Sequence, residues 1–136
     1  MSSQLGFEAT LPLTLDEAIE RVTEALKGEG FGVLTRIDVQ DTLKKKIGAD
    51  FRPYVILGAC NPQLAHRALS AHGEVGMMLP CNVTVESAGE GSSLVRIADP
   101  GMMMTVGGLG DIEALRQVGE EAHARLAKVA QTLRGG

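Results

Sequence analysis

The stretch Tyr54–Asn82, YVILGACNPQLAHRALSAHGEVGMMLPCN, decides the fold that the sequence predicts. It opens with Tyr54–Cys60, a short apolar run containing Val and Ile, which is typical of a strand covered on at least one face. Asn61 follows directly and suits an N-cap, and the next residue is a proline, which suits the first turn of a helix. We therefore predict a strand that passes at Cys60 directly into a helix over Pro62–Ala71.

Downstream of this helix the pattern indicates short strands. Glu74–Leu79 and Asn82–Ser87 are predicted as strands on either side of Pro80-Cys81, and the turn Gly89-Glu90-Gly91 leads into a third strand over Ser93–Ala98. Close spacing with turn residues between the strands favours antiparallel neighbours.

The remaining elements follow from capping signals and apolar periodicity. Thr14 and Glu17 have the spacing of a capping box, so a helix is expected to begin there and to end near Gly28. The other expected elements are an edge strand over 5–11, a half-buried strand over 31–39, a short helix over 40–47 capped by Asp41 and ended by Gly48, a connector over 49–53, and a long helix over 111–133.

This order of elements favours an α+β two-layer sandwich, with a mainly antiparallel sheet covered by helices. With 136 residues the chain is expected to form a single domain over residues 1–136. Its apolar fraction of 44% and charged fraction of 22% are those of an ordinary globular protein.

Composition and charge argue against several classes of partner and location. The formal net charge of −4 and the scarcity of aromatic residues argue against nucleic-acid binding. No apolar run approaches the length of a membrane span, and no charged start followed by an apolar block is present, so we expect a cytoplasmic protein. The two cysteines lack CxxC spacing and are expected to be free thiols in a reducing compartment.

Sulfur supplies the clearest candidate for a metal site. Thiolates and thioethers select soft ions such as Cu(I). The candidate ligands are Cys60, Cys81, Met78 and Met104. The alternative is that the methionines fill gaps in the core or in an interface, as methionine commonly does. A zinc site is not expected, because His66, His72 and His123 have no companions at the usual ligand spacing.

A thiol enzyme is the second possibility. A thiol at the start of a helix ionises more easily than a free one, so Cys60 is a candidate nucleophile, with Cys81 as the resolving partner and His66 as a base. The alternative is that Cys60 is a small buried apolar residue that closes the strand. The sequence does not decide whether the chain is an enzyme, and it names no cofactor.

A binding site is expected where the two Cys-Asn pairs face each other across one cleft. Such a pocket would lie between the helix that starts at Pro62 and the bend at Leu79–Cys81. The residues expected to line it are Cys60, Asn61, Pro62, Pro80, Cys81, Asn82 and Asp99. Asp99 next to a proline is also a turn former, and only secondarily a general base.

Three motifs carry a resemblance to a known family. GACNP at Gly58–Pro62, LPCNV at Leu79–Val83 and ADP at Ala98–Pro100, followed by a Met-rich stretch, are together similar to the bacterial and archaeal family called domain of unknown function 302. The resemblance runs from the first strand to the last helix. It implies a TATA-binding-protein-like fold, with a curved antiparallel sheet and helices on one face, and a homodimer. It implies no established activity, so we expect a small binding or accessory protein.

Overall fold

A computed structural model describes residues 5–135 of the chain, so residues 1–4 and 136 of the predicted domain lie outside the described part. Five antiparallel strands form one sheet in the order β1-β5-β4-β3-β2. The strands are β1 (Gly6–Leu11), β2 (Gly32–Asp38), β3 (Tyr54–Cys60), β4 (Cys81–Ser87) and β5 (Ser93–Ala98). β1 and β2 are the edge strands, and β3 lies between β4 and β2.

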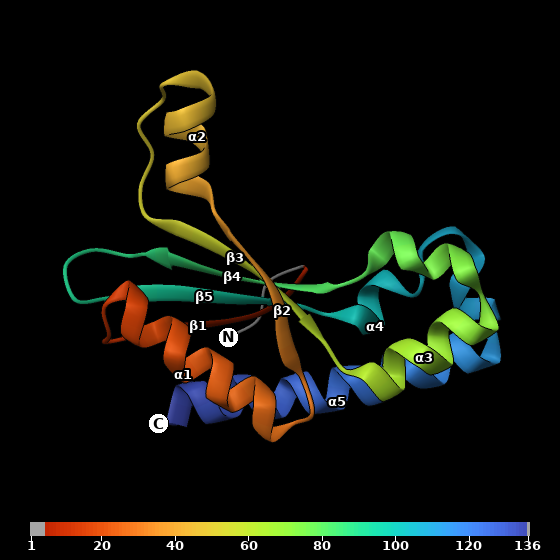
Figure 1. Cartoon of the computed structure of the whole chain (residues 1–136). Coiled ribbons are helices and arrows are strands. Elements are labelled where there is room, and N and C mark those ends of the chain that lie inside the picture. The colour runs from red at the N-terminus through yellow and green to blue at the C-terminus, as the bar shows by residue number, and fades with distance from the viewer. Residues whose placement is uncertain (1–4, 136) are drawn as a thin grey trace.

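All the helices except α2 lie along one face of this sheet or beyond its end (Figure 1). The helices are α1 (Leu15–Gly28), α2 (Val39–Ile47), α3 (Pro62–Ala71), α4 (Pro100–Met103) and α5 (Glu113–Gly135), with the 3-10 helices η1 (Gly73–Met78) and η2 (Val106–Asp111). α1 and α5 pack on the sheet, α3 packs along α5 beyond the end of β3, and α2 stands apart. The predicted α+β two-layer sandwich is confirmed. None of these helices is long and apolar enough to cross a membrane.

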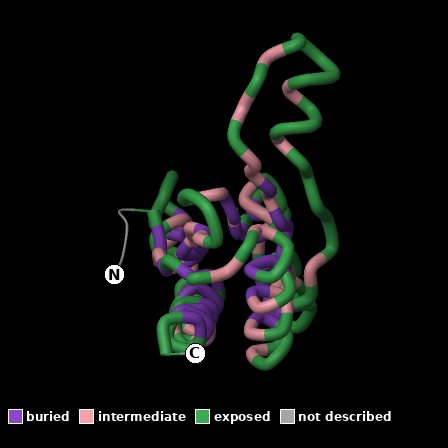
Figure 2. Tube along the Cα trace, turned by 90° about the vertical axis from the view of Figure 1, so that its left-hand side faces the viewer, coloured by how far each residue is buried: buried purple, intermediate pink, exposed green. Residues whose placement is uncertain are grey.

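The hydrophobic core lies between the sheet and the layer of α1 and α5. Alternate residues of the central strands point into it, as the period of a strand requires. They include Val55, Leu57, Val83, Val85, Val95 and Ile97, all at most 2% exposed. Leu115, Leu126 and Leu133 of α5 close the core from the other side, and the tube in Figure 2 is buried mainly along these elements.

The capping signals act as predicted at two helices. Thr14 Oγ1 accepts a hydrogen bond from the Glu17 N–H at 3.3 Å, and Glu17 Oε1 accepts one from the Thr14 N–H at 3.0 Å. Asn61 Oδ1 accepts the Leu64 N–H at 3.1 Å and opens α3, which spans the predicted Pro62–Ala71. Both side chains satisfy backbone donors that the first turn of a helix leaves unpaired.

The predicted strand over 74–79 is wrong, because these residues form the 3-10 helix η1. β3 already pairs with β2 on one side and β4 on the other, so it offers no free edge to a further strand. The segment instead turns directly after α3 and inserts the fully buried side chain of Val75 into the core. Two strands, rather than three, therefore follow α3.

Several smaller predictions also require correction. α2 is capped by Asp38, whose Oδ1 accepts the Asp41 N–H at 2.9 Å, so Asp41 lies inside the helix. α5 begins at Glu113, two residues after the predicted start. β2 is not half-buried: all of its residues except Val33 are exposed, because it is an edge strand that extends beyond the helical layer.

Candidate functional site

The two cysteines lie on neighbouring strands at one end of the sheet. Cys60 is the last residue of β3, and Cys81 is the first residue of β4, where it pairs with Ala59. From the spacing of strands and the rise per residue, the two α-carbons lie roughly 6 Å apart. Both thiols are free, and Cys81 is buried whereas Cys60 is partly exposed. The fold thus brings together two residues that are 21 positions apart in the sequence.

An apolar cavity of about 30 Å³ lies beside the cysteines. Sulfur enters it from three elements: Cys60 ends β3, Cys81 begins β4, and Met104 follows α4. The other walls come mainly from α3 and α5, with Phe31, Ala59, Asn61, Leu64, Ala65, Ala68, Leu79, Pro100, Val118 and Ala122. Because a water molecule needs about 10–15 Å³, the cavity holds one or two atoms of that size and no organic metabolite.

Burial changes the chemistry of the Cys81 thiol. It is 8% exposed, and the removal of water disfavours its charged form. This burial, followed by the negative charges of Cys60 and Asp99 nearby, raises the pKa of Cys81 from 9.0 to about 11. At neutral pH Cys81 is therefore a protonated thiol and a poor nucleophile, since the thiolate is the reactive form.

Asp99 and His123 form a hydrogen-bonded pair close to this cavity. Asp99 Oδ2 lies 2.8 Å from His123 Nδ1, and its Oδ1 accepts the Gly101 N–H at 2.9 Å, which caps α4. The imidazole also packs against the ring of Phe7, with 5.4 Å between the ring centroids. Asp99 thus fixes both α4, which leads to Met104, and the orientation of the His123 ring.

Pro80 packs on the open face of the sheet, over Gly58. A Cβ atom at Gly58 would lie 2.2 Å from Thr35 Oγ1 and 2.8 Å from Pro80 Cγ, so only glycine fits there. Asn82 pairs with Gly58 and is exposed. Pro80 and Asn82, together with Met78, line a shallow surface groove that is separate from the sulfur-lined cavity. Of the two methionines predicted as metal ligands, only Met104 lines that cavity.

Two further predicted site residues also lie away from the cavity. His66 and Pro62 are on the exposed side of α3, and neither lines it, so the structure gives His66 no role as a base for Cys60. Asn61 does line the cavity, but its Oδ1 is engaged as the cap of α3.

The donor set determines which ions the site suits. No three His, Cys, Asp or Glu side chains within residues 5–135 are placed to hold a metal ion together. Two thiols and one thioether, in contrast, are the donors that suit a soft monovalent ion.

Sequence reasoning missed several parts of this site. Phe31, Val118 and Ala122 come from distant segments and have only the apolar periodicity of core residues. The Asp99–His123 pair spans 24 residues and two elements, so no local spacing reveals it. The apolar stripe of the last helix marks Val118 and Ala122 as buried, but it does not indicate that they line a cavity.

Comparison with known proteins gives a family. Among solved structures, the crystal structure of an uncharacterised conserved DUF302 protein from Bacillus stearothermophilus is similar, with 34% identity and a TM-score of 0.83. The match covers 97% of this chain and 100% of that one. No curated protein matches the sequence. Residues 7–133 match the family described as "Domain of unknown function DUF302", so the chain belongs to the family that its GACNP and LPCNV motifs predict.

Proposed function

We propose that this chain is a single-domain, cytoplasmic, homodimeric binding protein whose site takes a soft monovalent metal ion such as Cu(I). The observation that carries the proposal is that Cys60, Cys81 and Met104 line one small apolar cavity. Three sulfur donors are sufficient for Cu(I), which prefers thiolate and thioether ligands. A reducing compartment keeps both the ion and the thiols in the required state.

The electrostatics of the cavity support a cation. Burial, and after it negative charge at Cys60 and Asp99, opposes ionisation of Cys81 and raises its pKa to about 11. A bound cation would reverse this effect, because it stabilises the thiolate and displaces the proton to solvent. The Cu(I) affinity should therefore rise about tenfold per pH unit for each proton displaced. This dependence holds while the pH is below the pKa of Cys81.

The size and lining of the cavity support a small ion over an organic ligand. Its volume of about 30 Å³ excludes a metabolite unless α3 moves. Its walls are largely aliphatic, with Leu64 and Ala68 at most 4% exposed. A hard, strongly hydrated ion would lose its water there without gaining oxygen ligands, whereas a soft ion gains sulfur ligands.

The test is an anaerobic titration of the reduced protein with Cu(I) against a chromogenic Cu(I) chelator. We expect one ion per chain. Cys60→Ser and Cys81→Ser should each weaken binding by more than about a hundredfold, since even outer-shell substitutions cost about ten- to a hundredfold. Met104→Leu should weaken it by about tenfold. Met102→Leu is the matched control, because Met102 is 51% exposed and does not line the cavity.

Equal Cu(I) affinity of the wild type and a Cys60→Ser/Cys81→Ser double variant would contradict the proposal. Circular dichroism of each variant shows whether it is folded, so that a loss of binding is not confused with a loss of structure. Raising the pH from 6 to 8 should increase the Cu(I) affinity of the wild type. The Cu(I) affinity of Cys81→Ser should depend less steeply on pH, because binding displaces one proton fewer.

A thiol-dependent redox or transfer enzyme is the second candidate, favoured by the pairing of Cys81 with Ala59, the residue directly before Cys60. It requires at least one thiol that ionises near neutral pH. The raised pKa of Cys81 opposes a role for it as an attacking thiol. Alkylation rates measured from pH 6 to 10 separate the two: rapid labelling of either cysteine below about pH 7 would favour the enzyme.

A further inference from the structure

Residues 33–53 form a projection, here called the arm, most of which lies clear of the helical layer (Figure 1); at its base Val33 packs against the hydrophobic core. It comprises most of β2, all of α2 and the connector to β3. α2 lies on the side of the sheet opposite α1 and α5 (Figure 1). No residue of the arm is buried, and Figure 2 shows it as an exposed extension of the molecule.

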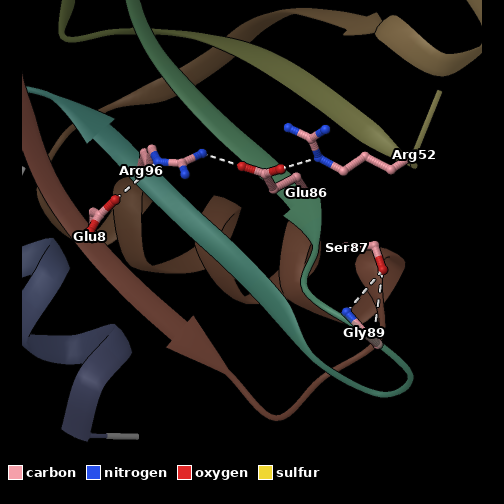
Figure 3. Close-up of polar contacts among 6 residues, drawn as sticks. All are labelled: Glu8, Arg52, Glu86, Ser87, Gly89 and Arg96. Carbon is pink, nitrogen blue, oxygen red and sulfur yellow. Dashed lines mark hydrogen bonds and ion pairs between the residues drawn. The ribbon is translucent and has the colours of Figure 1, made fainter.

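The base of the arm is fixed to the sheet by specific contacts. Arg52 is ion-paired with Glu86 of β4, which also binds Arg96 of β5, and Arg96 in turn pairs with Glu8 of β1 at 3.0 Å (Figure 3). The Ser87 N–H donates to the Pro53 carbonyl at 3.0 Å. The arm is therefore held in a defined position, although none of its residues is buried by the rest of residues 5–135.

An uncovered arm is costly for the isolated chain. α2 has nine residues, and a helix of that length is marginal in water without tertiary packing. Leu34, Ile37 and Ile47 are 67%, 48% and 72% exposed, respectively. Of the strands described, β2 pairs only with β3, which leaves its other edge available for pairing. The roughly twenty residues of the arm match one side of a standard protein interface.

The charges of the arm and of the rest of the chain are opposite in sign. The arm carries five basic residues, Arg36, Lys44, Lys45, Lys46 and Arg52, and three acidic ones, Asp38, Asp41 and Asp50. The rest of the chain has eight basic and fourteen acidic residues. These opposite net charges favour contact between the arm of one copy and the body of another, and a two-fold axis would make this contact twice.

We propose that the arm is the surface through which this chain binds a second copy of itself, with its apolar side chains buried and its lysines facing the acidic body of the partner. This inference rests on the homodimer in the proposed function and supplies its interface. It does not involve the sulfur-lined cavity, which lies at the other end of β3.

Sedimentation equilibrium of the full chain tests the apolar part. Ile47→Asp should raise the dimer dissociation constant roughly tenfold or more, as truncation of an interface anchor does. Leu69→Asp is the matched control, because Leu69 is also partly exposed, at 44%, but lies on α3. It should leave the dissociation constant unchanged.

Salt dependence tests the electrostatic part. Added salt should weaken the wild-type dimer, because it screens the attraction between arm and body. In Lys44→Glu/Lys45→Glu/Lys46→Glu the arm becomes acidic, so association should be weaker, and added salt should now strengthen it. Lys27→Glu reverses one charge on the body and should not weaken the dimer.

A wild type that stays monomeric up to about 1 mM, the concentration at which even very weak complexes form, would overturn the proposal. An Ile47→Asp variant that dimerises like the wild type would also overturn it. So would an effect of Leu69→Asp on dimerisation as large as that of Ile47→Asp. The Cu(I) titration, repeated on folded Ile47→Asp, keeps the two proposals separate. Unchanged Cu(I) binding with weakened dimerisation supports the arm, and failure of Cu(I) binding in every variant contradicts only the metal site.

Discussion

The two ends of strand β3 lie in different surroundings. At its end, Cys60 passes into α3, which is capped by the buried Asn61 and packs along α5 over an apolar cavity. At its start, Tyr54 follows the arm, whose helix α2 has no buried residue. Both helices have a side-chain cap and an amphipathic sequence. The difference predicts that tertiary cover, rather than local sequence, decides how far each helix contributes to the stability of this chain.

The largest expected effect comes from the covered helix. Leu64→Ala, in α3, removes a side chain that is 4% exposed and should lower the free energy of unfolding by about 2–5 kcal/mol. Ile47→Ala, in α2, should change it by no more than about 0.5 kcal/mol in the monomer. Urea unfolding at low protein concentration measures both. Equal losses of unfolding free energy for the two variants would contradict this difference between α3 and α2, because they would show that α2 is packed against other parts of the same chain.

A smaller effect is expected at Glu86, where the base of the arm joins the sheet. Burial alone would raise the pKa of this carboxyl, but hydrogen bonds and charge from Arg52 and Arg96 outweigh it, so the pKa is lowered. Glu86→Gln keeps the shape and removes the charge, and should cost about 1–3 kcal/mol at neutral pH.

The sign of the pH dependence follows from the lowered pKa. The stabilisation is complete above the unfolded-state pKa of about 4.3 and is lost as the pH falls through the lower folded-state value. The difference in unfolding free energy between wild type and Glu86→Gln should therefore be constant from about pH 6 to 8 and shrink below about pH 4.3. A difference that grows in acid would show that the arginines do not stabilise the charged form.

The smallest effects are expected at the two helix caps. Asn61→Ala should cost about 1–2 kcal/mol, because the Leu64 N–H that it leaves unpaired is in a buried environment. Asp38→Ala should cost only about 0.5 kcal/mol, since water can replace the exposed cap of α2. Thermal unfolding measures both. If a second copy covers α2, as proposed, the loss for Asp38→Ala should be larger at protein concentrations at which the chain dimerises.

The sequence predicted the centre of the fold better than its ends. β3 and α3 have the predicted bounds because an apolar run, an N-cap and a helix-opening proline coincide at Cys60–Pro62. η1 differs from the predicted strand because its apolar residues, Val75 among them, suit both structures, and β3, paired on both edges, cannot accept a further strand beside it. Such information comes from topology and not from local pattern.

The candidate site was predicted only in its local parts. The cysteines and Met104 stand out by residue type, but their common cavity depends on strand register and on α5, which is distant in sequence. His66 was a reasonable candidate from its spacing to Pro62, yet helical rotation turns it to solvent. The exposure of β2 was missed because its alternating apolar residues are also typical of a covered strand.

Gly58 has a consequence for how this chain tolerates substitution. It carries no side chain and takes no part in chemistry. The space beside it is filled by Thr35 of β2 and by Pro80, which directly precedes β4. A single added methyl group would force apart the chain segments that flank it, and Pro80 directly precedes Cys81. The placement of the Cys81 sulfur thus depends on the absence of a side chain at residue 58.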